Sequence, residues 1–193
     1  MHQIRIHGRG GQGVVSAAEM LSVAAFIEGK YSQAFPSFGS ERMGAPVVAF
    51  CRIDDKEIRS REPVAQPDVV IIQDPTLLRS TDVFAGLDLS GFVLINSGRT
   101  LEQLDLITLQ QKLPAGHAHT VPATELALEY VGRPIPNAAL MGAFAATTGI
   151  VRIEAVLSAI RQKFPGEIGE KNCSAAKEAF NATGASAPLV ATA

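Results

Sequence analysis

The chain has 193 residues, a length that suits one domain with an appended helical hairpin. Its apolar (47%) and charged (19%) fractions are those of an ordinary globular protein, and its net charge of −2 comes without a basic run or stripe, which speaks against a nucleic-acid-binding protein. The N-terminus has no signal-peptide pattern and no apolar run approaches the ~20 residues of a membrane span, so we expect a cytoplasmic protein.

The side chains that commonly bind metals are too dispersed to predict a metal site. Cys51 and Cys173 lie far apart and match no metal or redox motif, so we expect two reduced thiols. His117 and His119 would point to one face of a strand, but no third ligand accompanies them. We therefore expect no metal site in this chain.

The first thirty residues predict a strand, a glycine-rich loop and a helix. Residues 3–7 alternate polar and apolar side chains, as a short strand does, and the glycine-rich run 8–13 follows at once. Residues 14–28 are apolar around most of the helical circumference, which indicates a buried helix, and Gly29 is placed to end it. This is a Rossmann-like opening unit.

We expect further strands at residues 31–36, 47–53, 69–73, 91–96 and 117–121, with the clearest apolar and β-branched runs at 47–53, 69–73 and 91–96, and a short returning strand at 57–61. The strands at 47–53 and 57–61 flank the turn Asp54-Asp55, so we expect them to form an antiparallel hairpin. Asp74-Pro75 should stop the strand at 69–73 and open a short helical turn.

Helical patterns occupy the intervals and the end of the chain, at residues 101–113, 122–131, 137–149, 153–164 and 170–180. Strands that alternate with helices predict an α/β fold, with a mostly parallel sheet flanked by helices and an antiparallel hairpin. We expect one α/β domain over residues 1–180. The small, uncharged residues 181–193 predict a flexible C-terminal tail.

The glycine-rich loop predicts a ligand that carries phosphate. Gly8, Gly10 and Gly13 fit the pattern G-x-G-x-x-G between a strand and a helix, and Gly11 is an additional glycine. Glycine lets the backbone approach a phosphate closely, and the helix N-terminus behind the loop favours an anion. The alternative is a tight strand-to-helix turn, which also needs glycines.

Two side chains in this loop could assist the backbone. Arg9 could place its charge against the phosphates, and Gln12 could donate a hydrogen bond. A dinucleotide would also need an acidic residue at the end of a second strand, ~20 residues on. Glu28 has nearly that spacing but lies in the wrong place relative to the next strand, so NAD and FAD are disfavoured.

A second loop, at residues 37–46, concentrates polar and charged side chains between two prolines. Its candidate contact residues are Ser37, Ser40, Glu41 and Arg42. Loops of this composition often carry function. The alternative is a solvated turn with an internal contact between Glu41 and Arg42.

Together the two loops resemble the gamma subunit of pyruvate:ferredoxin oxidoreductase and related 2-oxoacid:acceptor oxidoreductases. The resemblance rests on GRGGQG at 8–13 and SFGSERMGAPV at 37–47, and extends to QPDVVI at 66–71 and NAALMGA at 137–143. It spans about residues 3–180. Met43 departs from the family pattern, which usually has a second arginine there.

The resemblance implies a subunit of an enzyme that oxidatively decarboxylates a 2-oxoacid and forms an acyl-CoA. The partners would be alpha, beta and delta-type subunits, which hold thiamine diphosphate with Mg and [4Fe-4S] clusters and pass electrons to ferredoxin or NAD. This chain would supply no catalytic residue, since it has no C-x-x-C run and no G-D-G segment. The loop at 37–47 is more similar to that of pyruvate-type gamma subunits than to that of 2-oxoglutarate or indolepyruvate types. The enzymes of aromatic 2-oxoacids resemble the pyruvate type in this loop, so both substrate classes remain open.

The resemblance also implies roles for the two loops. Residues 8–13 would meet the phosphates of coenzyme A, with Arg9 and Gln12 as side-chain contacts and Asn137 at the same crevice as a helix cap. Ser37, Ser40, Glu41 and Arg42 would face the catalytic subunits. Two alternatives remain: a stand-alone Rossmann-type protein that binds NAD or FAD, and a non-catalytic scaffold subunit whose glycine loop is only a turn.

Overall fold

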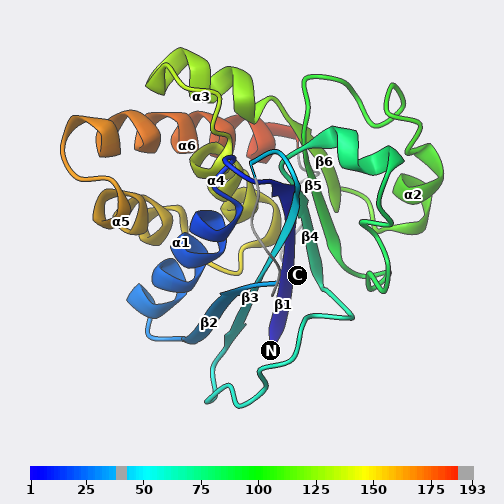
Figure 1. The fold of residues 1–193 in the computed structure, drawn as a ribbon, viewed down its shortest axis with the longest axis horizontal. Helices are drawn as coiled ribbons and strands as arrows, with labels where there is room; N and C mark the ends of the chain where they lie inside the picture. Colours follow the sequence, from blue (N-terminus) through cyan, green and yellow to red (C-terminus); the bar gives the residue numbers. More distant parts are fainter. Residues whose placement is uncertain (38–42, 187–193) are drawn as a thin grey trace.

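A six-stranded mixed sheet forms the centre of the molecule (Figure 1). The computed structural model describes residues 1–37 and 43–186. The strands are β1 (His2–Arg9), β2 (Tyr31–Pro36), β3 (Pro46–Asp54), β4 (Val69–Ile72), β5 (Phe92–Asn96) and β6 (Ala118–Val121). They lie in the order β2-β3-β1-β4-β5-β6. The pairs from β1 through β4 and β5 to β6 are parallel, which confirms the predicted α/β class.

The antiparallel hairpin involves the predicted strand at 47–53, but its partner is the strand before it and not the segment after it. It consists of β2 and β3, which pair from Tyr31 with Asp54 to Pro36 with Ala49. The prediction that residues 57–61 return as a strand beside 47–53 is wrong, because that segment is irregular. Both edges of β3 are already paired, one with β2 and the other with β1, so no backbone groups remain for a further strand.

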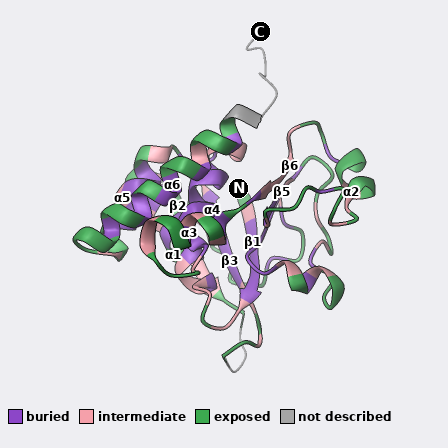
Figure 2. Cartoon of the chain, turned by 90° about the horizontal axis from the view of Figure 1, so that it is seen from above, coloured by how far each residue is buried: buried purple, intermediate pink, exposed green. Residues whose placement is uncertain are grey.

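Helices cover both faces of the sheet. One face carries α1 (Val14–Ile27), α3 (Ala123–Val131), α4 (Asn137–Thr148), α5 (Ile153–Lys163) and α6 (Glu167–Ser186). The other carries the 3-10 helix η1 (Pro75–Arg79) and α2 (Ile107–Lys112), which pack through a smaller core. In the view from above, buried residues line the interface between the sheet and the helical layer (Figure 2).

Two helix predictions need correction at their ends. The helix expected at 101–113 is confined to α2, because Asp105 adopts a left-handed conformation (φ 60°) and Leu106 N–H bonds to Leu101 O at 2.9 Å, which closes the preceding turn. The last helix, expected at 170–180, begins at Glu167 and continues to Ser186. The segment expected to open the tail is therefore helical up to Ser186.

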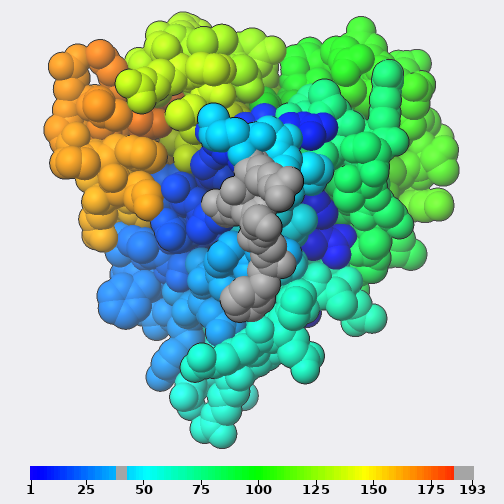
Figure 3. All heavy atoms as spheres, in the orientation of Figure 1, coloured from blue at the N-terminus to red at the C-terminus, as the bar shows by residue number. Residues whose placement is uncertain are grey.

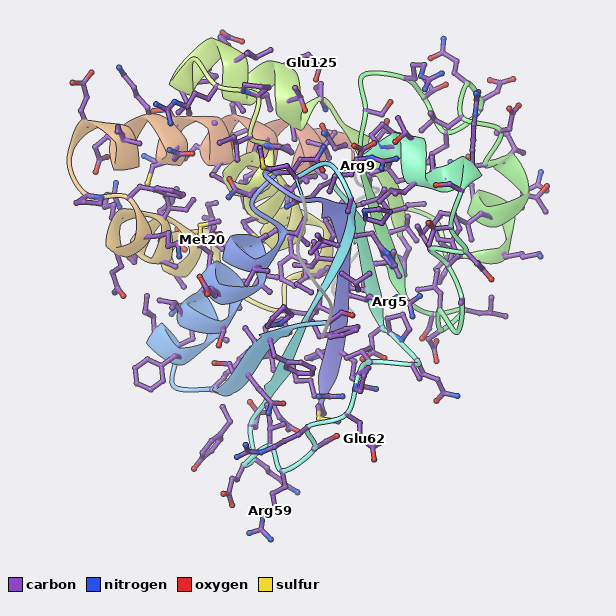
Figure 4. The ribbon with its side chains drawn as sticks, in the orientation of Figure 1. Arg5, Arg9, Met20, Arg59, Glu62 and Glu125 are labelled. Carbon is purple, nitrogen blue, oxygen red and sulfur yellow. The ribbon has the colours of Figure 1, made fainter. Side chains whose placement is uncertain are left out.

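A projecting segment after β3 is anchored by two buried arginines. The segment, residues 55–68, forms the lower end of the molecule in Figure 3, and Figure 4 labels Arg59 and Glu62 within it. Arg52 donates to the carbonyl oxygen of Glu62, and Arg5 donates to that of Val64 at 3.4 Å. Two buried side chains of the sheet thereby hold the segment in place through its backbone carbonyl oxygens.

Candidate functional site

The candidate site lies where the parallel strands β1 and β4 end. After β1 the chain enters α1 on one face of the sheet, and after β4 it enters η1 on the opposite face. Two neighbouring strands whose connections leave in opposite directions open a crevice at their carboxyl ends, which is where open α/β sheets bind ligands.

The glycine loop has the backbone that its sequence predicts. Gly11 and Gly13 have φ angles of 94° and 74°, in the left-handed region that favours glycine. Gly8 is in β1, where a Cβ would lie 2.6 Å from a methyl group of Val14, so this glycine permits close packing of strand and helix. Gly13 is the N-cap of α1 and provides no side chain to cap its first turn.

A hollow of about 320 Å³ opens beside this uncapped helix end. It is lined by Arg9, Gly10, Gly11, Gly13, Val14, Val15, Ser16 and Val47. Amide groups at the start of a helix attract anions, and the glycines leave their backbone accessible. The arrangement can therefore hold a phosphate or another small anionic group.

Arg9 spans the crevice from β1 to the start of η1 (Figure 4). Its Nε lies 3.2 Å from Asp74 Oδ2, and its Nη2 donates to the hydroxyl of Thr76 at 2.9 Å. Its Nη1 donates to the carbonyl oxygen of Gly44 at 3.0 Å. The guanidinium group therefore stays at the mouth of the loop, where its side chain is 30% exposed.

Gln12 closes the loop on itself. Its Oε1 accepts the N–H of Arg9 at 2.8 Å, and its Nε2 donates to Asp74 Oδ2 at 2.9 Å. The side-chain amide of Gln12, predicted from the sequence to donate to a phosphate, is thus hydrogen-bonded within the protein.

Asp74 is a site residue that sequence reasoning missed. Burial alone would raise the pKa of its carboxyl group, but hydrogen bonds from Thr76 and Gln12 and the charge of Arg9 together lower that pKa below its usual value. Asp74 also accepts the Thr76 N–H at 2.9 Å as the cap of η1. The sequence Asp-Pro-Thr after a strand indicates such a cap. It does not indicate that the second carboxylate oxygen of Asp74 contacts the glycine loop.

The structure brings Asn137 to the glycine loop, as predicted, but in a different role. It is buried (2% exposed) against Gly13, where an added Cβ would lie 2.6 Å from its Nδ2. The N-cap of α4 is Pro136, and Asn137 Oδ1 accepts the adjacent N–H of Ala138 at 2.8 Å. Asn137 therefore packs against the glycine loop as its structural support. It is the first residue of α4 and not the N-cap.

The second predicted loop meets the first one. Gly10 N–H bonds to Ala45 O at 2.9 Å, and Gly44 N–H bonds to Gly10 O at 3.1 Å. Met43 is 88% exposed and lies over Gly11. Of the contact residues predicted here, Ser37 continues the hairpin by donating its N–H to Val48 O at 2.8 Å. Ser40, Glu41 and Arg42 lie outside the described residues.

A buried polar group next to the crevice was also missed. Asn96 at the end of β5 donates to the carbonyl oxygen of Gln73 and to the hydroxyl of Thr124, both at 2.8 Å. The side-chain amide of Gln73 is fully buried, and neither of its polar atoms has a hydrogen-bond partner in the described part of the chain. Buried polar side chains therefore lie at the carboxyl ends of both β4 and β5.

The described residues include neither a metal-binding cluster nor a membrane-spanning helix. Over residues 1–37 and 43–186, no three His, Cys, Asp or Glu side chains are close enough to hold a metal ion together. In the same part of the chain, no helix is both long enough and apolar enough to cross a membrane.

Comparison with known proteins gives a consistent result. The family model described as pyruvate ferredoxin/flavodoxin oxidoreductase matches residues 3–182. The pyruvate/ketoisovalerate oxidoreductases common subunit gamma of Thermococcus litoralis is 54% identical over 183 residues, which cover 95% of this chain and 97% of that one. The crystal structure of pyruvate oxidoreductase subunit PORC from Thermotoga maritima is 39% identical, with a TM-score of 0.78 over 93% of this chain and 95% of that one.

A more distant structure has the same fold. It is 2-oxoglutarate:ferredoxin oxidoreductase from Magnetococcus marinus, with 2-oxoglutarate, coenzyme A and succinyl-CoA bound. Its TM-score is 0.70 at 17% identity, over 97% of this chain and 31% of that one. At this identity the likeness shows the fold alone, here as one part of a longer chain.

Proposed function

The chain belongs to the pyruvate ferredoxin/flavodoxin oxidoreductase family, and on this basis we propose that it is the gamma subunit of a multi-subunit 2-oxoacid oxidoreductase. The complex would oxidatively decarboxylate a 2-oxoacid of the pyruvate type, or an aromatic one, and transfer the acyl group to coenzyme A. Its alpha, beta and delta-type subunits would pass electrons to ferredoxin or to an NAD-linked acceptor in the cytoplasm.

The redox and carbanion chemistry would belong to the partner subunits. A [4Fe-4S] cluster is held by four thiolates, whereas this chain has two cysteines, Cys51 and Cys173, both buried. Thiamine diphosphate with Mg supplies the electron sink for decarboxylation when it is bound, and we assign it to the alpha and beta-type subunits. The role left for this chain is to bind and orient.

We propose that the glycine loop binds the phosphates of coenzyme A. The observation that carries this proposal is the uncapped N-terminus of α1, which opens into a hollow of about 320 Å³ with Arg9 at its rim. Phosphate oxygens would accept hydrogen bonds from the backbone amides in the first turn of α1, and the guanidinium group would balance their charge. Gln12 and Asn137 would support the loop, because their side chains are already bonded or packed inside it.

The loop at 37–46 would face the catalytic subunits. Exposure of Met43 beside the glycine loop supports this, because a partner seated on Met43 would also close over the proposed phosphate site. Ser37, Ser40, Glu41 and Arg42 remain the proposed contacts in this loop.

One observation favours a second reading, a scaffold subunit whose glycine loop is only a turn. Arg9 and Gln12 are already bonded to Asp74, which reduces what they can offer a ligand. The dinucleotide alternative has less support, because Glu28, its nearest candidate acid, caps the far end of α1 and pairs with Arg152 at 3.1 Å.

Purification of the tagged chain from its native host tests the proposal. We expect larger subunits that carry thiamine diphosphate and iron–sulfur clusters to co-purify, and we expect turnover with 2-oxoacids and coenzyme A. The substrate panel should include pyruvate, ketoisovalerate, an aromatic 2-oxoacid and 2-oxoglutarate. A lone protein with bound dinucleotide would overturn the proposal.

A single variant separates the coenzyme A role from the scaffold role. Arg9→Ala should raise the KM for coenzyme A by about tenfold and leave the CoA-independent decarboxylation half-reaction unchanged. An unchanged KM in an intact complex would favour the scaffold.

A further inference from the structure

The carboxylate of Asp74 divides its two oxygens between two different tasks. Oδ1 accepts the N–H and the hydroxyl of Thr76, at 2.9 and 2.5 Å, and thereby holds its own turn at the start of η1. Oδ2 accepts the Gln12 amide at 2.9 Å and faces Arg9 Nε at 3.2 Å, and thereby holds a loop more than sixty residues earlier in the chain.

We propose that Asp74 is a positioning residue for the anionic ligand of the glycine loop, acting through Arg9 and Gln12. The inference rests on the proposed binding of coenzyme A by this loop. Asp74 would not touch the ligand. It would fix the two side chains that set the shape of the loop and the place of its positive charge.

The geometry of Arg9 supports this role. A guanidinium group has five N–H donors. In the described part of the chain, Asp74, Thr76 and Gly44 engage its three nitrogens from the protein side, which leaves donors for a ligand at the exposed edge. A long flexible side chain that is already fixed loses less conformational entropy when a phosphate binds, so the site is preorganised.

The same geometry distinguishes positioning from simple charge compensation. If Asp74 only neutralised Arg9, its removal would free the positive charge, and an anion would bind more tightly. If it positions Arg9 and Gln12, its removal would loosen the loop, and the anion would bind more weakly. The two roles therefore predict opposite signs.

Asp74→Asn isolates the loop contacts. Its oxygen can still accept from Thr76 and hold the turn, whereas its NH₂ group would meet the donors of Gln12 and Arg9 and cannot accept from them. Asp88→Asn is the matched control, because Asp88 Oδ1 accepts the N–H and hydroxyl of Ser90 in the same way, at 2.7 and 2.6 Å, on an exposed loop. Both variants remove one negative charge and preserve one turn.

The test uses the purified complex and measures the Kd of coenzyme A by calorimetry together with its KM and kcat. We expect Asp74→Asn to raise Kd and KM by about tenfold, with kcat at saturating coenzyme A within about twofold of the parent. Asp88→Asn should leave all three unchanged. In an Arg9→Ala/Gln12→Ala background, Asp74→Asn should have no further effect, because the groups through which it acts are absent.

Each other outcome has a definite meaning. Unchanged or tighter binding in Asp74→Asn, with weaker binding in Arg9→Ala, overturns the positioning role and leaves the coenzyme A site in place. A full additional loss in the double-variant background also overturns it. Unchanged binding in Arg9→Ala overturns both. If Asp74→Asn does not assemble, Gln12→Met removes the amide that Asp74 holds, and an unchanged Kd there overturns the inference.

Discussion

Gly142 in α4 lies directly against the backbone of Ala176 in α6, so that a Cβ at position 142 would overlap the carbonyl oxygen of Ala176. Helix α4 is buried from Asn137 to Ala145, between the sheet and α6. Its small residues let the two helices approach closely, and a backbone group cannot move aside as a flexible side chain could.

Gly142→Ala should therefore destabilise the protein. We expect a loss of about 1–3 kcal/mol in the free energy of unfolding, or roughly 2–4 °C in Tm for each kcal/mol. Gly184→Ala in α6 is the matched control, because no atom of the described residues lies within 4 Å of a Cβ there, and alanine should stabilise that helix slightly. Equal Tm values for the two variants would contradict the packing argument.

Gly13 combines a left-handed backbone with a close neighbour, and the two effects can be measured separately. Gly13→Ala should cost more stability than Gly29→Ala, because both positions have a positive φ (74° and 77°) but only Gly13 has a side chain, Asn137, within 2.6 Å of the added Cβ. We expect a difference of about 1–2 kcal/mol in denaturant unfolding. Asn137→Ala should reduce that difference. If the difference persists in this background, Asn137 is not its cause.

Acid should weaken the protein through His7. Its Nε2 accepts a hydrogen bond from Arg5 Nε at 3.1 Å, and burial together with the charge of Arg5 lowers the pKa of His7 from 6.5 to about 4. In this window the unfolded chain binds more protons than the folded one, so stability is complete above pH 6.5 and falls as the pH decreases toward 4. The loss reaches at most about 3 kcal/mol.

Urea unfolding at several pH values tests the role of His7. His7→Gln keeps an acceptor for Arg5 but does not titrate, so its stability should depend less on pH between 4 and 6.5 than that of the parent. Identical slopes in the two proteins would assign the acid sensitivity to other groups.

The sequence predicts the elements of this fold better than their pairing. Apolar runs locate β4 and β5 because strands buried on both faces carry their own signal. The segment 57–61 follows a turn signal, Asp54-Asp55, but does not pair with β3, because β1 and β2 occupy both edges of that strand. Which strand pairs with each edge of β3 depends on long-range packing, and a local sequence pattern does not carry that information.

In the candidate site too, local features are predictable from the sequence and long-range contacts are not. Gly8 to Gly13 are recognisable because a strand, a glycine pattern and a helix are contiguous in the chain. Asp74 is not recognisable as a site residue, because its contact with Gln12 depends on the parallel pairing of β1 with β4. The meeting of Gly10 with Ala45 likewise follows from the register that sets Arg9 opposite Pro46.

Both cysteines should be inert in the folded chain. Burial raises the pKa of Cys51 to about 12, and burial also raises the pKa of Cys173, which donates to Leu157 O at 3.5 Å. Since the thiolate is the reactive form, a thiol reagent at pH 8 should label neither residue in the native protein and both in urea. Labelling in intermediate urea should follow the unfolding transition. Rapid labelling of native Cys173 would show that α6 separates locally from α5, since the described structure leaves that thiol 1% exposed between them.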